Sequence, residues 1–352
     1  MITEDFFEKI NSHWKSQLPF VIFKKPNDND ISVYLNSSNE IKAGGGFNEA
    51  GFVFSPFMDT SKNSIWFPRN SSIILTTHMH SDQIDSLATN NTSETNTNHK
   101  EKHIRVVEKA LEKLRLNELQ KVIVSRVETL SIDEHVPIEW FKKMCSLYPN
   151  TFCYCWYHPK VGMWLGASPE TLVSLKKSYF ETIALAGTMA YNDTTGVEWG
   201  KKEIEEQQMV VDSMLKALTP IVFNIQKGET TTQKAGSLLH LKTVIKGQLK
   251  KVNQLGELVE VLHPTSAVCG LPKLKAQEFI LGNEGYHRSY YTGYLGEYIP
   301  EGNTQLYVNL RCMEIEQEQA KIYVGGGITA ASDPVLEWEE TVNKSKIMKA
   351  VL

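Results

Sequence analysis

The chain lacks any apolar run of membrane length and any secretory signal pattern, so we expect a cytoplasmic protein without a membrane partner. Its net charge of −4 provides no basic excess for binding nucleic acid. The five cysteines are odd in number and lack metal-ligand spacing, which favours reduced thiols over a disulfide framework. The hydrophobic fraction of 41% and the charged fraction of 22% are typical of a globular protein with a large core.

Short β-rich runs and a few long amphipathic segments alternate along the 352 residues. Residues 121–127 and 152–157 have the composition of strands, whereas 197–218 has the spacing of a long helix. Residues 81–100 are rich in Asn, Thr and Ser and predict a solvated loop. Strands joined mostly by hairpins, with helices placed between them, indicate an α+β fold.

The C-terminal stretch combines two β-rich runs, a triple glycine and a helix. Residues 306–315 and 321–327 predict a hairpin that ends in a glycine turn. Ser332 and Asp333 are candidate N-caps of the helix, and Pro334 lies in its first turn. The turn consists of Gly325, Gly326 and Gly327. Because a glycine turn lets a ligand approach backbone N–H groups closely, this stretch predicts an anion site.

Two of the predicted helices each carry a glutamate pair at i and i+3, which puts both carboxylates on one face. The pairs are Glu203 with Glu206, and Glu337 with Glu340. The expected buried stripe of the first helix, away from its glutamates, is Ile204, Val211, Leu215 and Leu218. Acidic helix faces are usually solvated, but two such faces meeting would supply oxygen ligands for Mg²⁺. Neither pair includes Cys or His, which disfavours softer metals.

Two ionisable residues lie within strongly apolar sequence. Lys121 opens the strand 121–127, and periodicity alone favours a solvent-exposed lysine at a strand edge. Glu170 follows a proline at the end of a strand. A buried carboxyl there would have a raised pKa and would suit a general acid near neutral pH. The alternative for Glu170 is a charge at the N-terminus of a helix, and both interpretations stay open.

Nine segments, in this order, resemble the chorismate-utilising enzymes: anthranilate, aminodeoxychorismate, isochorismate and salicylate synthases. The segments are Lys121-Val-Ile-Val-Ser-Arg, Ser168-Pro-Glu, Leu185-Ala-Gly-Thr, Glu203-x-x-Glu206, Leu262-His-Pro-Thr, Tyr291-Thr-Gly, Asn309-Leu-Arg, Gly325-Gly-Gly-Ile and Glu337-Trp-Glu-Glu-Thr-x-Asn-Lys. The resemblance covers residues 100–352, while 1–95 match only in general character. It implies one catalytic domain over 1–352, in which two stacked antiparallel sheets carry outer helices and the site lies between the sheet layers.

The resemblance also selects a branch of the family. A lysine that opens the Lys-Val-x-x-Ser-Arg strand marks the members that add water to the ring, and here it is Lys121. Ammonia-using members lack this base, so no glutaminase partner is expected. The branch with a lysine nucleophile has it before the Gly-Thr pair, where this chain has Ala186. The implied activity is that of an isochorismate synthase, an isomerase feeding menaquinone or siderophore biosynthesis. The alternative is a salicylate synthase, which also eliminates pyruvate.

The family mechanism implies a base and an acid on either side of the ring of chorismate. Lys121 would take a proton from the water that attacks C2, and Glu170 would protonate the departing C4 hydroxyl. For this, the pKa of Lys121 must fall well below its ordinary value of about 10.4, through burial or neighbouring cations. No redox cofactor is required, because water is added and lost in one isomerisation.

The implied cofactor is Mg²⁺, which would chelate the ring carboxylate of chorismate. Glu206 and Glu340 would bind the ion directly, while Glu203 and Glu337 would reach it through water or orient the ligands. The implied substrate-binding residues are Gly187, Thr188, His263, Tyr291, Arg311, Gly325, Gly326, Gly327 and Lys344. A monomer or a weak homodimer is expected.

Arg311 is the residue expected to bind the carboxylate of the enolpyruvyl arm. In strand alternation it lies opposite Val308 and Leu310, which would direct its guanidinium out of the core. A guanidinium in that position can bind a carboxylate through two parallel hydrogen bonds.

Overall fold

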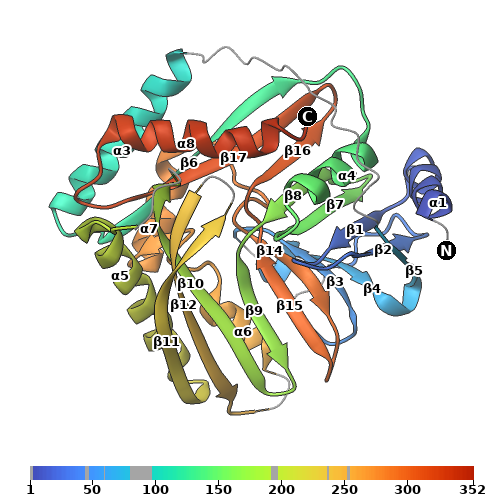
Figure 1. The fold of residues 1–352 in the computed structure, drawn as a ribbon, viewed down its shortest axis with the longest axis horizontal. Coiled ribbons are helices and arrows are strands. Elements are labelled where there is room, and N and C mark those ends of the chain that lie inside the picture. The colour runs from blue at the N-terminus through green and yellow to red at the C-terminus, as the bar shows by residue number, and fades with distance from the viewer. Residues whose placement is uncertain are drawn as a thin grey trace.

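Two antiparallel sheets, with helices around them, make up the computed structural model of this chain (Figure 1). The structure describes residues 3–43, 47–58, 60–79, 97–191, 197–235, 238–251 and 254–352. No helix in these ranges is long and apolar enough to cross a membrane. The predicted α+β class, with two stacked antiparallel sheets and outer helices, is confirmed.

The strands of both sheets pair only with antiparallel neighbours within the described ranges. In spatial order, the nine strands of the first sheet are β13 (Gly270–Leu271), β6 (Lys121–Ser131), β17 (Gln319–Ile328), β16 (Cys312–Glu316), β8 (Gly162–Ser168), β7 (Phe152–His158), β1 (Phe20–Lys24), β2 (Asp30–Asn36) and β5 (Ser72–His78). The eight strands of the second are β11 (Val222–Ala235), β12 (Leu238–Leu249), β10 (Tyr179–Ala190), β9 (Thr171–Lys176), β15 (Asn303–Val308), β14 (Tyr294–Tyr298), β3 (Gly51–Ser55) and β4 (Ile65–Pro68).

Aromatic side chains fill the space between the sheets. Phe152 of the first sheet stacks on Tyr307 of the second, with ring centroids 4.1 Å apart. Phe54 stacks on Trp156 at 4.6 Å in the same way. These four side chains are buried, and each aromatic ring removes a large apolar area from water. Burial of this aromatic layer therefore holds the sheets together.

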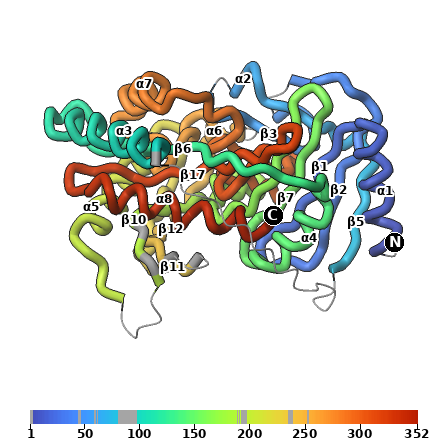
Figure 2. The backbone as a smooth tube through the Cα atoms, turned by 90° about the horizontal axis from the view of Figure 1, so that it is seen from above, coloured from blue at the N-terminus to red at the C-terminus, as the bar shows by residue number. Residues whose placement is uncertain are grey.

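Helices cover the outer faces of both sheets. They are α1 (Thr3–Lys15), α2 (Thr60–Asn63), α3 (Thr97–Arg115), α4 (Pro137–Leu147), α5 (Lys201–Leu218), α6 (Leu255–Leu262), α7 (Lys273–Asn283) and α8 (Pro334–Lys349), with a short 3₁₀ turn at Arg69–Ser71. Apolar residues of α1 and α4 join the core of the first sheet, and those of α5 and α6 join the core of the second. Figure 2 shows α3 beside α8, which packs along β17.

The C-terminal stretch differs from the predicted hairpin. β15 ends at Val308 in the second sheet, and β16 begins at Cys312 in the first, so the chain crosses between the sheets over 309–311. Arg311 lies in this crossing, with a left-handed φ of 48°. The hairpin is β16–β17, and the single strand predicted for 306–315 is wrong. Sequence alternation could not reveal the change of sheet, because both halves are equally β-rich.

The glycines predicted as a turn lie inside β17, where Gly325 pairs with Ser125 and Gly327 with Ile123. The helix start was predicted more accurately, because Asp333 caps α8 by accepting hydrogen bonds from the N–H groups of Val335 and Leu336. β17 therefore has three consecutive residues without side chains where it pairs with β6.

The buried face of α5 agrees with the prediction only in part, since Val211 and Leu218 are buried as expected. Ile204, expected in the apolar stripe, is 52% exposed, whereas Glu206, expected on the polar side, is buried. The helix buries Val210, Met214 and Leu218, which follow Glu206 at intervals of four residues. The carboxylate of Glu206 therefore points into the protein.

Candidate active site

A cavity lies where β6 and β17 of the first sheet face β10 and β12 of the second. Ten of the predicted site residues line it: Lys121, Glu170, Gly187, Glu206, Tyr291, Arg311, Gly325, Gly326, Gly327 and Lys344. They come from segments spread over more than two hundred residues of sequence. Their convergence agrees with the expected position of a site between the sheet layers.

Lys121 is almost completely buried, with a side chain that is 1% exposed. Its Nζ lies 2.8 Å from Oε1 of Glu206 on α5. The interpretation as a solvent-exposed lysine at a strand edge is wrong, because β6 is not an edge strand: Leu271 of the short strand β13 pairs with Lys121 itself. Lys121 therefore points from the first sheet into the cavity, with a carboxylate as its partner.

The carboxylate of Glu206 is held in its ionised form. Burial acts against ionisation, but Lys121, Lys202 and the N–H of Gly187 outweigh it and keep the pKa of Glu206 below its ordinary value. Gly187 has a φ of +68°, and a Cβ there would lie 3.1 Å from the Cβ of Glu203. Glycine is therefore required for β10 to come this close to α5.

Glu170 lies at the connection between β8 and β9 and lines the same cavity. Burial raises its pKa to about 8, although the positive charge of Lys121 acts in the opposite direction. The expected burial of this carboxyl is confirmed, and the alternative of a helix N-terminal charge is wrong because β9 begins at Thr171. Near neutral pH the carboxyl of Glu170 is mostly protonated, as a proton donor requires.

The strand β17 is free of side chains where carboxylates approach it. A Cβ on Gly327 would lie 2.8 Å from Oε1 of Glu206. A Cβ on Gly326 would lie 3.2 Å from Oε2 of Glu337 and 3.6 Å from Oε1 of Glu340. The glycines therefore form a cradle into which α5 and α8 direct their carboxylates.

Three of the four predicted metal-binding glutamates are paired with lysines. The pairs are Lys121 with Glu206 at 2.8 Å, Lys202 with Glu337 at 3.0 Å, and Lys344 with Glu340 at 2.7 Å. The fourth glutamate, Glu203, lies close to its own helix terminus, because a Cβ on Gly200 would be 2.5 Å from Glu203 Oε2. Within the described ranges, no three Asp, Glu, His or Cys side chains are arranged to bind one ion together.

The carboxylates nevertheless suit a hard divalent cation. Oε2 of Glu337 is buried and has no hydrogen-bond partner in the described part of the chain, so it retains a free acceptor. Burial and the charge of Glu340 raise the pKa of Glu337, against the effect of Lys202. Carboxylate oxygens are hard ligands of the kind that Mg²⁺ binds in proteins.

Some of the predicted substrate-binding residues line the cavity and others do not. Burial lowers the pKa of Arg311 to about 10, so its guanidinium remains charged at neutral pH in the cavity wall. Lys344 donates to the carbonyl oxygen of Gly325. His263 is not among the residues that line the cavity; its Nε2 lies 3.2 Å from the carbonyl oxygen of Phe57. The side chain of Thr188 lies outside the described part of the structure.

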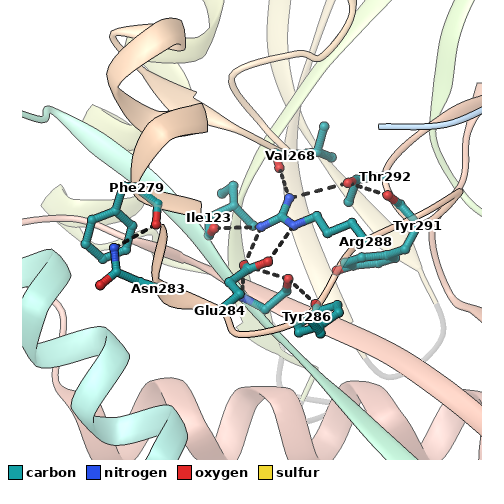
Figure 3. A network of polar contacts seen from close by, with 10 residues as sticks. Ile123, Val268, Phe279, Asn283, Glu284, Tyr286, Arg288, Tyr291 and Thr292 are labelled. Atoms are coloured by element: carbon teal, nitrogen blue, oxygen red, sulfur yellow. Dashed lines mark hydrogen bonds and ion pairs between the residues drawn. The ribbon is translucent and has the colours of Figure 1, made fainter. Parts of the chain in front are cut away.

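A buried ion pair supports one wall of the cavity (Figure 3). The guanidinium of Arg288 donates to both carboxylate oxygens of Glu284, at 2.6 and 2.9 Å. It also donates to the carbonyl oxygens of Ile123 and Val268 and to the hydroxyl of Thr292. These last three residues line the cavity, so one guanidinium joins three of its wall segments.

Sequence reasoning missed Arg288, Lys202 and His240. Arg288 follows Glu284 at i+4, a spacing that suggests an ion pair. Lys202 precedes the first glutamate of the α5 pair, and a cluster of buried carboxylates requires cations nearby. His240 lines the cavity and its Nδ1 donates to the carbonyl oxygen of Gly187. Burial lowers the pKa of His240 to about 3, so the ring is neutral.

This fold and this arrangement of residues are those of a chorismate-utilising enzyme. A family model described as "Chorismate binding enzyme" matches residues 58–352, and the chain belongs to that family.

Among its relatives, the chain is similar to the isochorismate synthase DhbC of Bacillus subtilis, with 34% identity over 194 residues that cover 52% of this chain and 49% of the relative. It is also similar to the isochorismate synthase MenF of Escherichia coli, with 30% identity over 259 residues covering 70% and 59%. The alignments thus span about half to three-fifths of these relatives. A solved structure of the Escherichia coli MenF shares the fold, with a TM-score of 0.81 at 22% identity over 95% of this chain and 88% of that one.

Proposed function

We propose that the protein is an isochorismate synthase, which isomerises chorismate by adding water at C2 and removing the C4 hydroxyl. The observation that carries this proposal is the pairing of a buried lysine and a mostly protonated buried glutamic acid in one cavity. Water-adding chemistry needs a base and an acid at once, and Lys121 and Glu170 supply these two functions. The similarity to isochorismate synthases supports the same activity.

Glu170 donates its proton to the C4 oxygen, which leaves as water while the ring double bond shifts. Lys121 accepts a proton from the water whose oxygen forms the new bond at C2. Nζ of Lys121 lies 2.8 Å from Oε1 of Glu206, so it must exchange this contact for one with the attacking water before it takes the proton. Atoms balance without an oxidant, because one hydroxyl is lost and one is gained.

Mg²⁺ is the proposed cofactor, with Glu206 and Glu340 as ligands and Glu203 and Glu337 as supporting groups. When bound, it would act as a Lewis acid on the ring carboxylate. Arg311, Tyr291 and Lys344 are proposed to hold the second carboxylate of chorismate. Burial strengthens the charge-assisted hydrogen bonds of Arg311, because little water competes for its guanidinium.

Product analysis tests the proposal directly. The purified protein is incubated with chorismate, with and without MgCl₂, and the products are separated by liquid chromatography. Isochorismate that forms only with Mg²⁺ supports the proposal. Salicylate together with pyruvate would instead identify a salicylate synthase, and glutamine-dependent anthranilate would identify an ammonia-using subunit. Unchanged chorismate would overturn the activity altogether.

A further inference from the structure

Lys202 connects the two helices that carry the acidic pairs. It lies on α5, one turn before Glu206, and its Nζ donates to Oε1 of Glu337 on α8 at 3.0 Å. The side chain of Lys202 is 30% exposed, whereas that of Glu337 is 4% exposed. A partly exposed ammonium therefore neutralises an almost fully buried carboxylate across the interface between α5 and α8.

Lys202 interacts electrostatically with three carboxylates. Burial acts to lower its pKa, but Glu337, Glu206 and Glu340 together raise the pKa above its ordinary value. Lys202 is thus close enough to three carboxylates, from two helices, to interact with all of them. A divalent cation bound by these carboxylates would occupy the same region of negative potential.

The other two lysines of the site are anchored elsewhere as well. Lys344 also donates to the carbonyl oxygen of Gly325, and Lys121 is enclosed within the first sheet. In the described part of the chain, the hydrogen bond of Lys202 goes to Glu337 alone. Because its side chain also reaches solvent, Lys202 is the lysine that can leave the carboxylates without opening the core.

We propose that Lys202 is a resident counter-ion of the carboxylate site, which a divalent cation displaces when it binds. This rests on the proposed function, in which Glu337 and Glu340 belong to the metal site. In the metal-free protein Lys202 neutralises Glu337, which would otherwise be a buried unpaired charge. On metal binding, the ion takes over this role and the ammonium moves into solvent. Lys202 therefore sets the metal affinity by competing for the ligands.

Competition and simple tethering predict opposite results for Lys202→Met. If Lys202 competes with the ion, its removal leaves the site more negative and Mg²⁺ binds about tenfold more tightly or better. If Lys202 only holds α5 against α8, its removal loosens the site and Mg²⁺ binds more weakly. Lys202→Arg keeps the positive charge and should bind Mg²⁺ no more tightly than the wild type.

Isothermal titration of MgCl₂ into the substrate-free protein measures this affinity at fixed ionic strength. Lys201→Met is the matched control, because it removes the same charge from the neighbouring position, where the side chain is 89% exposed and pairs with Glu205. A second measurement needs no variant: amine-reactive labelling of the wild type, followed by mass spectrometry. Mg²⁺ should increase the labelling of Lys202 several-fold and leave that of Lys201 unchanged.

This inference would be overturned if Lys202→Met bound Mg²⁺ as tightly as the wild type or more weakly. It would also be overturned if the labelling of Lys202 did not respond to Mg²⁺. Neither result would affect the proposed activity, because turnover of chorismate is measured separately. Failure of the wild type and every variant to bind Mg²⁺ would overturn the inference together with the proposed metal site. Tighter binding by Lys202→Met, with Lys201→Met unchanged, supports displacement.

Discussion

Glu170 should make the protein less stable as the pH rises, because burial gives its carboxyl a pKa of about 8 in the folded chain. In the unfolded chain the same carboxyl titrates near about 4.3. The folded state binds the proton more tightly, so this contribution to stability is fully present below about pH 4.3. It is lost as the pH rises towards about 8, at about 1.4 kcal/mol per unit. From about pH 5 to about pH 7, the loss is about 3 kcal/mol.

Glu170→Gln isolates this effect, because the amide has nearly the same shape and does not titrate. Urea denaturation at several pH values gives the free energy of unfolding of both proteins. The free energy of unfolding of the variant minus that of the wild type should increase by about 3 kcal/mol from about pH 5 to about pH 7. Glu205→Gln, on the exposed side of α5, is the control for removing a carboxylate from the surface.

The same variant tests the chemistry. If Glu170 gives the proton to the leaving hydroxyl, Glu170→Gln abolishes turnover of chorismate and also removes the loss of stability that accompanies a rise in pH. Wild-type turnover should fall as the pH rises through about 8, where Glu170 loses its proton. A stability difference that does not change with pH would refute the burial of a protonated carboxyl. Turnover retained by Glu170→Gln would refute its role as the acid.

Three further predictions follow from the geometry of the cavity. Lys121→Gln should abolish chorismate turnover but keep Mg²⁺ binding, measured by product analysis and by titration of MgCl₂; turnover that persists would exclude Lys121 as the base. Gly327→Ala should reduce both Mg²⁺ binding and turnover at least about tenfold, because the added Cβ would lie 2.8 Å from Oε1 of Glu206. The control is Gly282→Ala, which should match the wild type because its added Cβ would have no atom within 4 Å. Arg288→Met should destabilise the protein by about 3 kcal/mol or more in urea denaturation, because the carboxylate of Glu284 would stay buried without its counter-ion; an unchanged midpoint would contradict this.

The fold class could be predicted from local sequence patterns, and the predicted site residues from the family motifs. Strand composition and hairpin-like spacing predicted the α+β class, the family resemblance implied the two antiparallel sheets, and the start of α8 was visible in Asp333 and Pro334. The family motifs brought together Lys121, Glu170 and Glu206 before any coordinates were known. These residues lie close together only in the folded chain, so the motifs carried information that periodicity lacked.

The errors come from features that depend on tertiary partners. Lys121 begins its strand, so periodicity places it near solvent; only the pairing with Leu271 of β13 shows that the strand start is covered. The buried face of α5 includes Glu206, whose carboxylate contacts Lys121 of β6, and this partner is not visible in the sequence of the helix. Arg311 enters the cavity because the chain changes sheets there, which no alternation pattern records.

The glycines of β17 and the lysine–glutamate ion pairs of the cavity are physically related. The three glycines of β17 let α5 and α8 bring carboxylates against the sheet, where Glu206 and Glu337 are buried. Each buried carboxylate then needs a cation, since an unpaired buried charge is strongly destabilising. In a protein without metal, lysines are the available cations, and they bind the same oxygens that a metal would use. If these glutamates bind the proposed Mg²⁺, the same lysines compete with the ion, and the affinity of the proposed site would depend on both.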